Sequence, residues 1–193
     1  MHVARKMGVL KKEASLLDVT AARVVEAVKG TPVRADGVAN VNSTCPWLDD
    51  MYGVDMTKWY AQAYYDSIAE LYASWGVDYI KADDMSSSAN AREPYHGPEI
   101  EALKKAILKT GRPMVLSLSH GPTPLANARH VAQFAELWRI SDDVWDNWEQ
   151  VVRQFDLCRD WAPHIVSNHW PDADMLPLGR LSLRFFREGP RDS

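Results

Sequence analysis

Charged side chains recur at the ends of short β-rich segments in this 193-residue chain. Lys81 and Asp83 lie at the end of one such segment, and Arg139 and Asp143 lie at and just after the end of another. Residues two apart in a strand point to the same side, so each segment presents its polar groups together. Two carboxylates that meet at such an edge can divide the cleavage of a glycosidic bond, because one attacks the anomeric carbon while the other protonates the leaving oxygen. The pattern predicts Asp83 and Asp143 as the reacting pair.

Basic and aromatic side chains near the same ends could hold a polar substrate. Lys81 would keep Asp83 ionised, and Arg139 offers a bidentate fork to a substrate hydroxyl or carboxylate. Further polar groups lie at the ends of two neighbouring segments: Ser117, Ser119, Asp172 and Asp174. Several tryptophans could stack on a sugar ring, although packing in the core is an equally good interpretation for each. These tryptophans are Trp138, Trp145, Trp148 and Trp170.

Histidines in the predicted loops favour a competing chemistry. His96, His120 and His169 follow or adjoin the strand-end aspartates, and a mixture of imidazole and carboxylate could bind a divalent metal. No HxH or HExxH spacing supports such a site. A metal-dependent barrel hydrolase therefore stays the weaker alternative, and we expect no bound metal.

From Asp55 onward, helical and β-rich segments alternate four times. Predicted helices run from 55 or 57 to 74 and over 98–110, 125–134 and 145–161; predicted strands cover 77–82, 113–119, 137–140 and 165–169. Such alternation is typical of parallel βα units with right-handed crossovers. Because the chemistry gathers at the strands' carboxyl ends, the fold class is α/β of the (β/α)8 TIM-barrel type, with an open doubly wound sheet as the lesser alternative.

The domain organisation follows from the same pattern. The whole chain, 1–193, is expected to form one partial TIM-barrel domain. Residues 5–54 have weak periodicity, with one possible helix over 19–29, and are predicted to be mainly a long βα loop region. Residues 55–183 form the core βα units, and 184–193 form a divergent tail.

Composition excludes several classes of protein. With 46% hydrophobic and 25% charged residues, the chain is typical of soluble globular domains. The net charge of −4 and the lack of Lys/Arg runs predict neither a nucleic acid nor a membrane surface as partner. The first six residues lack an apolar signal-peptide region, so no export signal is expected in this chain and the cytoplasm is the default location.

Three segments, in order and at suitable spacing, resemble glycoside hydrolase family 27, the α-galactosidase or melibiase family. Residues 75–84 (WGVDYIKADD) resemble its nucleophile strand, and residues 138–148 (WRISDDVWDNW) resemble its acid/base segment. Residues 170–176 (WPDADML) resemble its Trp-Asn-Asp-Pro-Asp-Met-Leu signature. The resemblance extends from about 42 to 183 and, faintly, over 2–14.

The resemblance implies a role for each matching residue. Asp83, not Asp84, would be the nucleophile, and Asp143, not Asp142, the acid/base. The implied sugar-binding residues are Lys81, Arg139 and Asp174, with His2 in place of a strand-end aromatic. The family retains anomeric configuration, which requires two carboxyl groups about 5 to 5.5 Å apart and a covalent glycosyl-enzyme. No metal or organic cofactor is implied.

One substrate-binding position departs from the family. Ser119 stands where animal-type galactosidases have a Glu that reads the sugar's 2-hydroxyl. A smaller residue leaves room for a 2-acetamido group, so both terminal α-D-galactosides and α-N-acetylgalactosaminides are expected substrates.

The family's barrel has eight strands, and the resemblance in this chain covers about the third to the seventh: four full strands and one stub. An incomplete barrel supports a second hypothesis, in which the chain is a catalytically inactive fragment that binds sugar weakly or assembles with a partner. Open barrel edges present unpaired strands, which favour self-association.

Overall fold

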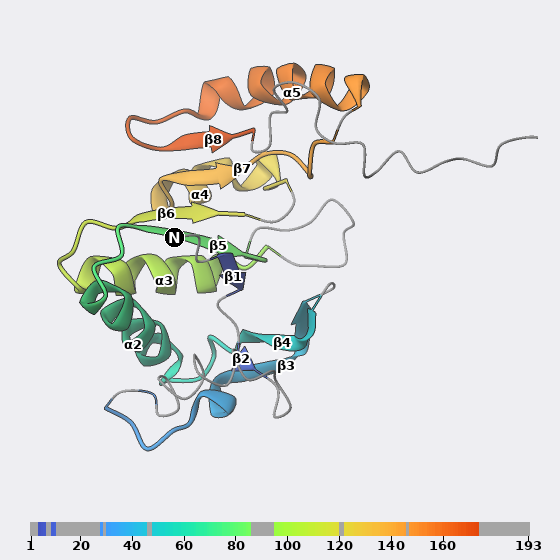
Figure 1. Cartoon of the computed structure of the whole chain (residues 1–193). Helices are drawn as coiled ribbons and strands as arrows, with labels where there is room; N and C mark the ends of the chain where they lie inside the picture. Colours follow the sequence, from blue (N-terminus) through green and yellow to red (C-terminus); the bar gives the residue numbers. More distant parts are fainter. Residues whose placement is uncertain are drawn as a thin grey trace, which may run out of the picture.

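A computed structural model of the chain describes residues 4–6, 9–10, 28, 30–45, 48–85, 95–119, 122–145 and 147–173. Its main element is a five-stranded, wholly parallel sheet in the order β1-β5-β6-β7-β8 (Figure 1). The strands are β1 (Ala4–Lys6), β5 (Tyr79–Asp83), β6 (Val115–Leu118), β7 (Leu137–Arg139) and β8 (Trp170–Asp172). The strand order never reverses, as in a barrel and unlike a doubly wound sheet.

A helix precedes each of the strands β5 to β8, which confirms the predicted βα units. These helices are α2 (Ala61–Ser74), α3 (Gly97–Lys109), α4 (Ala128–Phe134) and α5 (Trp148–Trp161). Two short 3-10 helices adjoin these elements: η2 (Leu125–Asn127) directly precedes α4, and η3 (Ala162–His164) directly follows α5. The described strands form an open sheet, as predicted for a partial barrel, and β1, β7 and β8 have three residues each.

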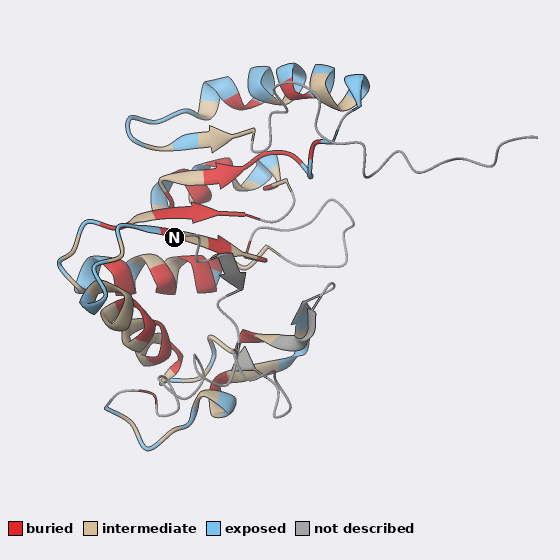
Figure 2. Cartoon of the chain, viewed as in Figure 1, coloured by how far each residue is buried: buried red, intermediate tan, exposed pale blue. Residues whose placement is uncertain are grey.

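The two faces of the sheet differ because side chains alternate along each strand. One face packs under the helices and is apolar and buried. Figure 2 colours most of β6 and the end of β7 as buried. The residues of this buried face are Ile80, Ala82, Leu116, Leu118 and Trp138. Trp138 is 0% exposed and packs against Trp161 of α5, with ring centroids 5.9 Å apart. The opposite face, which we call the concave face, carries the polar residues of the strand ends.

Helix α2 begins later than predicted. Asp55 Oδ1 accepts hydrogen bonds from the Thr57 amide (3.1 Å) and the Thr57 hydroxyl (2.6 Å). These bonds form a local turn. Short polar side chains that bond nearby backbone groups in this way offer the chain an alternative to the helix. Neither predicted cap therefore starts the helix, and α2 begins at Ala61, after Tyr60.

The last predicted strand is wrong in position. Residues 165–169 form a tight turn, in which Val166 and His169 make an isolated antiparallel bridge. Asn168 occupies the left-handed region at φ 65°, which Asn tolerates better than most residues. Strand β8 starts only at Trp170. Pro171, which lacks an amide hydrogen, fits there because β8 is an edge of the described sheet.

The stretch 5–54 is not mainly loop where it is described. It contains η1 (Ala35–Val38) and a three-stranded antiparallel sheet in the order β2-β4-β3. Its strands are β2 (Val9–Leu10), β3 (Ala39–Cys45) and β4 (Leu48–Val54). The small sheet lies between β1 and α2 in the chain, so it occupies the place of a βα loop. Weak sequence alternation concealed it, because β3 and β4 pair with register shifts.

The possible helix over 19–29 falls almost wholly outside the described residues, and the tail 184–193 falls entirely outside them. Among the helices that the structure does describe, none is long and apolar enough to cross a membrane.

Candidate active site

The carboxyl ends of the parallel strands bring the predicted polar residues into one row on the concave face. The register pairs Lys6 with Asp83 and Arg139 with Asp172. The Ser119 amide donates to the Ala82 carbonyl at 2.8 Å, which continues the ladder and brings Ser119 level with Asp83. Residues paired in a parallel sheet point to the same side. The row thus carries two carboxylates, a hydroxyl and a guanidinium on adjacent strands.

A second row lies one pleat deeper on the same face. It contains Lys81, Ser117, Leu137 and Trp170, through the pairs Lys81–Ser117, Ser117–Leu137 and Leu137–Trp170. Lys81 is therefore on the same side as Asp83, as the spacing predicts. Trp170 is half exposed on this face, where its ring could meet a substrate.

An ion pair carries Asp143 to the same face. Arg139 Nη2 donates to Asp143 Oδ1 at 2.5 Å, with the arginine side chain 7% exposed and the aspartate 52%. Because Arg139 points from the concave face, the carboxyl that it binds also lies over that face. Asp143 lies beyond the strand, because β7 ends at Arg139 and residues 141 and 142 form a bend.

Ser141 does not join the site. It is buried, and its hydroxyl donates to the Ala173 carbonyl at 3.0 Å, so it ties the end of β7 to the end of β8. The Ile140 amide makes a second tie to the Asp172 carbonyl at 2.9 Å. The chain beyond β7 is therefore anchored on β8.

The two aspartates that follow each other at the end of β5 have different surroundings. Asp83 is the last strand residue and partly exposed on the concave face. Asp84 adopts φ 62° and is 3% exposed, so the backbone turns away from the strand there. At the end of β7, Asp142 is exposed to solvent, whereas Asp143 contacts Arg139. In each pair a single aspartate belongs to the concave face.

A hydrogen-bonded cap that sequence reasoning missed follows Asp143. The Asn147 side chain accepts hydrogen bonds from the amides of Glu149 (2.9 Å) and Gln150 (3.4 Å) and so starts α5. The Gln150 side-chain oxygen accepts from the Trp145 amide at 2.9 Å. The sequence signal was available, because Asn followed three residues later by Gln is a capping-box pattern.

Two of the four tryptophans have no place on the concave face. Trp138 belongs to the buried face under α5, so its predicted stacking role is wrong and the packing interpretation is correct. Trp148 is the first residue of α5 and is largely exposed on that helix. Trp145, half exposed, lies two residues after Asp143.

His169, one of the two predicted histidines that the structure describes, lies far from the aspartates. His169 precedes β8, and its Nδ1 bonds the Ala135 carbonyl at 2.7 Å, at the end of the sheet opposite to the site. The error follows from the misplaced last strand. In the described part of the chain, no three His, Cys, Asp or Glu residues are grouped to hold a metal ion. His2, His120 and Asp174 lie outside the described residues.

His96 belongs to a buried network beside the strand end. His96 Nδ1 lies 3.0 Å from Glu99 Oε1, and the Tyr65 hydroxyl donates to Glu99 Oε2 at 2.8 Å. Burial, reinforced by the Glu99 charge, raises the pKa of Tyr65 well above its ordinary value, so this hydroxyl stays protonated. The His96 amide also donates to the Met85 carbonyl at 3.1 Å. This backbone bond joins the residue after Asp84 to the start of α3.

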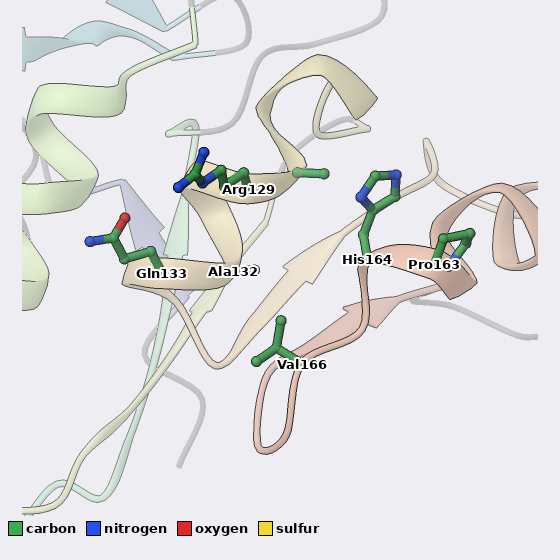
Figure 3. A pocket seen from close by; sticks show the side chains of 7 residues that line it. Arg129, Ala132, Gln133, Pro163, His164 and Val166 are labelled. Atoms are coloured by element: carbon green, nitrogen blue, oxygen red, sulfur yellow. The ribbon is translucent and has the colours of Figure 1, made fainter.

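A pocket of about 380 Å³ lies away from this site, between α4 and the turn after α5. Figure 3 shows Arg129 and Gln133 on α4, with His164 and Val166 across from them. None of the predicted site residues lines it. The two α4 side chains extend away from His164 (Figure 3), so the polar groups do not converge.

A family model and individual relatives of this chain point to the same protein family. The family model described as Alpha galactosidase A matches residues 50–188. Chicken (Gallus gallus) α-N-acetylgalactosaminidase is 32% identical over 130 residues, which cover 61% of this chain and 30% of that protein. Human α-galactosidase A is 28% identical over 152 residues, covering 74% of this chain and 32% of that protein. The chain therefore spans about a third of the length of these relatives.

The fold agrees with a solved structure of the same family. The structure of a GH27 β-L-arabinopyranosidase from Geobacillus stearothermophilus is 45% identical, with a TM-score of 0.76. The match covers 92% of this chain and 38% of that one. A match to about two fifths of the matched chain agrees with the open sheet of this chain as part of a TIM barrel. The chain belongs to the α-galactosidase family of glycoside hydrolases, family 27, of whose barrel it represents a part.

Proposed function

We propose that this chain carries the catalytic carboxylates of a retaining glycosidase that acts on terminal sugars of α-galactoside configuration. The observation that carries the proposal is the concave face, on which Asp83 ends β5 and Arg139 binds Asp143 beyond β7. Strand β6 lies between β5 and β7, so about two strand spacings separate the strands that end near the two aspartates. The bond to Arg139 holds the Asp143 carboxyl over the same face as Asp83, which supports a pair at the short separation of a retaining enzyme.

Each carboxyl group has a defined part in the proposed double displacement. An Asp83 oxygen bonds to the anomeric carbon as the glycosidic bond breaks, and Asp143 gives its proton to the leaving oxygen. Water then attacks the same carbon, Asp143 takes up the water's proton, and the bond to Asp83 breaks. The product keeps the anomeric configuration, and both carboxyl groups return to their starting states.

The surrounding groups would bind the sugar. Lys81 lies one pleat below Asp83 and can donate to the sugar hydroxyls, while Trp170 offers an aromatic surface on the same face. Asp174 and His2 complete the proposed set. Arg139 would serve first to hold the Asp143 carboxyl, because its guanidinium is already bonded to it.

The leading substrates are α-D-galactosides, with α-N-acetylgalactosaminides next because Ser119 leaves room beside the 2-position. A β-L-arabinopyranoside is a further candidate, favoured by the 45% identity to the Geobacillus enzyme. β-L-Arabinopyranose has the ring stereochemistry of α-D-galactose without the exocyclic carbon, so the same carboxyl pair can act on either sugar.

A non-catalytic protein is the competing proposal. The unpaired outer edges of β1 and β8 in the described sheet could bind a second copy or another strand. In that case the concave face would bind sugar weakly or not at all. A metal-dependent hydrolase is a weaker alternative, because His169 lies at the opposite end of the sheet.

Hydrolysis of three aryl glycosides by the purified chain tests the proposal. We expect turnover of the α-galactoside, the α-N-acetylgalactosaminide or the β-L-arabinopyranoside, and its loss in Asp83→Asn and in Asp143→Asn. The matched controls, the exposed Asp142→Asn and the parent chain with chelator, should keep full activity. No turnover together with concentration-dependent association in size-exclusion chromatography would favour the non-catalytic protein.

A further inference from the structure

The segment that carries Asp143 is a short arch, residues 140–145, fixed at its first end by β8. The Ile140 amide donates to the Asp172 carbonyl at 2.9 Å, and the Ser141 hydroxyl donates to the Ala173 carbonyl at 3.0 Å. Val144 is buried within the arch. Asp143 itself is half exposed, and its carboxyl accepts a hydrogen bond from Arg139. Its position therefore depends on the backbone of the arch.

The second end of the arch is held by α5. The Trp145 amide donates to Gln150 Oε1 at 2.9 Å, although Gln150 lies in the first turn of the helix. The Asn147 amide donates to the Trp145 carbonyl at 2.7 Å, and the Asn147 side chain caps the helix. One side chain, Gln150, thus joins the arch directly to the helix.

We propose that Gln150 is a positioning residue, which fixes the second end of the arch through the Trp145 amide and so keeps the Asp143 carboxyl over the concave face. The catalytic consequence rests on the proposed function. An acid/base group must stay within hydrogen-bond reach of the leaving oxygen. A displacement of about 1 Å can lower a rate about 10²-fold.

The hydrogen bond of Gln150 differs from that of an ordinary helix cap. In the usual capping box the side chain at this position reaches back to the amide of the cap residue itself. Here it reaches two residues further, to Trp145, so its hydrogen bond fixes the arch as well as the helix. Gln154, one turn along, donates to the Gln150 carbonyl at 3.4 Å and is buried, so the inner side of α5 supports this turn.

Three variants separate positioning from folding. Gln150→Met keeps the length and helix propensity of the side chain but removes its oxygen acceptor. Gln150→Glu keeps an acceptor and favours the first turn of a helix. Gln133→Met makes the same change at an exposed position of α4, away from the site.

The first readout is hydrogen exchange of the Trp145 amide in the full chain, which needs no activity. We expect protection in the parent, Gln150→Glu and Gln133→Met, and about tenfold or faster exchange in Gln150→Met. An unprotected Trp145 amide in the parent, or equal protection in Gln150→Met, would overturn the proposal.

The second readout is the dependence of kcat on the leaving group. A poor leaving group needs the proton from Asp143, whereas a dinitrophenolate does not, so Gln150→Met should slow the poor substrate about tenfold and the activated one much less. Gln150→Glu should restore both rates. Equal losses on both substrates would contradict positioning of the acid/base. A parent chain that hydrolyses neither substrate would refute the proposed function, and the amide exchange would still decide whether Gln150 holds the arch.

Discussion

The two faces of the parallel sheet are made by the same strands but have opposite characters. Leu118 is 1% exposed under the helices, whereas the next residue, Ser119, belongs to the concave face with Asp83 and Arg139. The helix-covered face is apolar and close-packed, and its contribution is to stability. The concave face gathers charged and hydroxyl groups whose burial would be costly without partners. Because side chains alternate along each strand, neighbouring residues belong to different faces: one contributes to the packed core and the next to the candidate site.

The largest expected effect concerns the concave face alone. Asp83→Asn should lower kcat about 10⁴-fold or more, because it removes the proposed nucleophile. The urea midpoint should stay near that of the parent, since Asp83 is partly exposed and outside the core. Steady-state rates and equilibrium unfolding measure both quantities. Residual activity near the parent level would assign the nucleophile elsewhere.

The next effect concerns the covered face. Leu118→Ala should lower the free energy of unfolding by about 2 to 5 kcal/mol, because it removes buried methyl groups and leaves a cavity. Ser119→Ala, the neighbouring change on the concave face, removes a single oxygen from a side chain that is also buried, so it should cost about 1 kcal/mol, less than Leu118→Ala. Urea denaturation of both variants makes the comparison. Equal losses would show that the faces do not differ in this way.

A smaller loss of unfolding free energy is expected from the buried hydrogen bond between Tyr65 of α2 and Glu99 of α3. Tyr65→Phe removes the hydroxyl that donates to the buried Glu99 at 2.8 Å. A buried acceptor that loses a donor costs about 1 to 3 kcal/mol. Thermal or urea unfolding gives the difference, and Tyr79→Phe, at an exposed tyrosine of β5, is the control. A neutral Tyr65→Phe would mean that the hydroxyl contributes nothing to the network.

The smallest effect concerns the solvent side of α3. Hydrogen bonds from Lys105, then from His130, lower the pKa of Glu101 below its ordinary value of 4.5. A carboxyl group with a lowered folded pKa stabilises the fold above pH 4.5, and this contribution is lost as the pH falls through the folded pKa. Because the Glu101 side chain is about a third exposed and its ion pairs are screened by solvent, Glu101→Gln should cost only a few tenths of a kcal/mol at pH 7.

The difference between parent and Glu101→Gln should shrink as the pH falls through the lowered folded pKa of Glu101 and vanish below it, where the parent carboxyl is also neutral. Urea unfolding at several pH values measures it. Lys105→Met completes a double-mutant cycle, in which the two losses should not add. A difference that grows as the pH falls would contradict the sign of the pKa shift.

Strand parity and helix period were sufficient to predict the βα units and the row of polar strand ends. Helix α3 was predicted almost to the residue, because Pro98 and Gly111 mark its ends in the sequence. Lys81 and Asp83 lie on the same face of β5 because side chains two positions apart in a strand point to the same side. Asp143 reaches that face by an ion pair with Arg139, which periodicity cannot foresee because the strand has already ended.

The sequence failed where side chains compete with the backbone for hydrogen bonds. Asp55 and Thr57 form a local turn instead of a helix cap, and Asn168 turns the chain where an apolar pair suggested a strand. The small antiparallel sheet was missed because β3 and β4 pair irregularly, so simple alternation breaks. The roles of Asp83 and Asp143 came from the family resemblance, and they stay predictions.

Trapping of the glycosyl-enzyme tests the central claim most directly. A fluorinated galactosyl fluoride that slows the second step should release fluoride and leave one sugar bonded to the chain. Intact mass and peptide mapping would then find the added mass on Asp83 in the parent and find none in Asp83→Asn. A sugar bonded to another residue, or turnover with inversion and no adduct, would contradict the account.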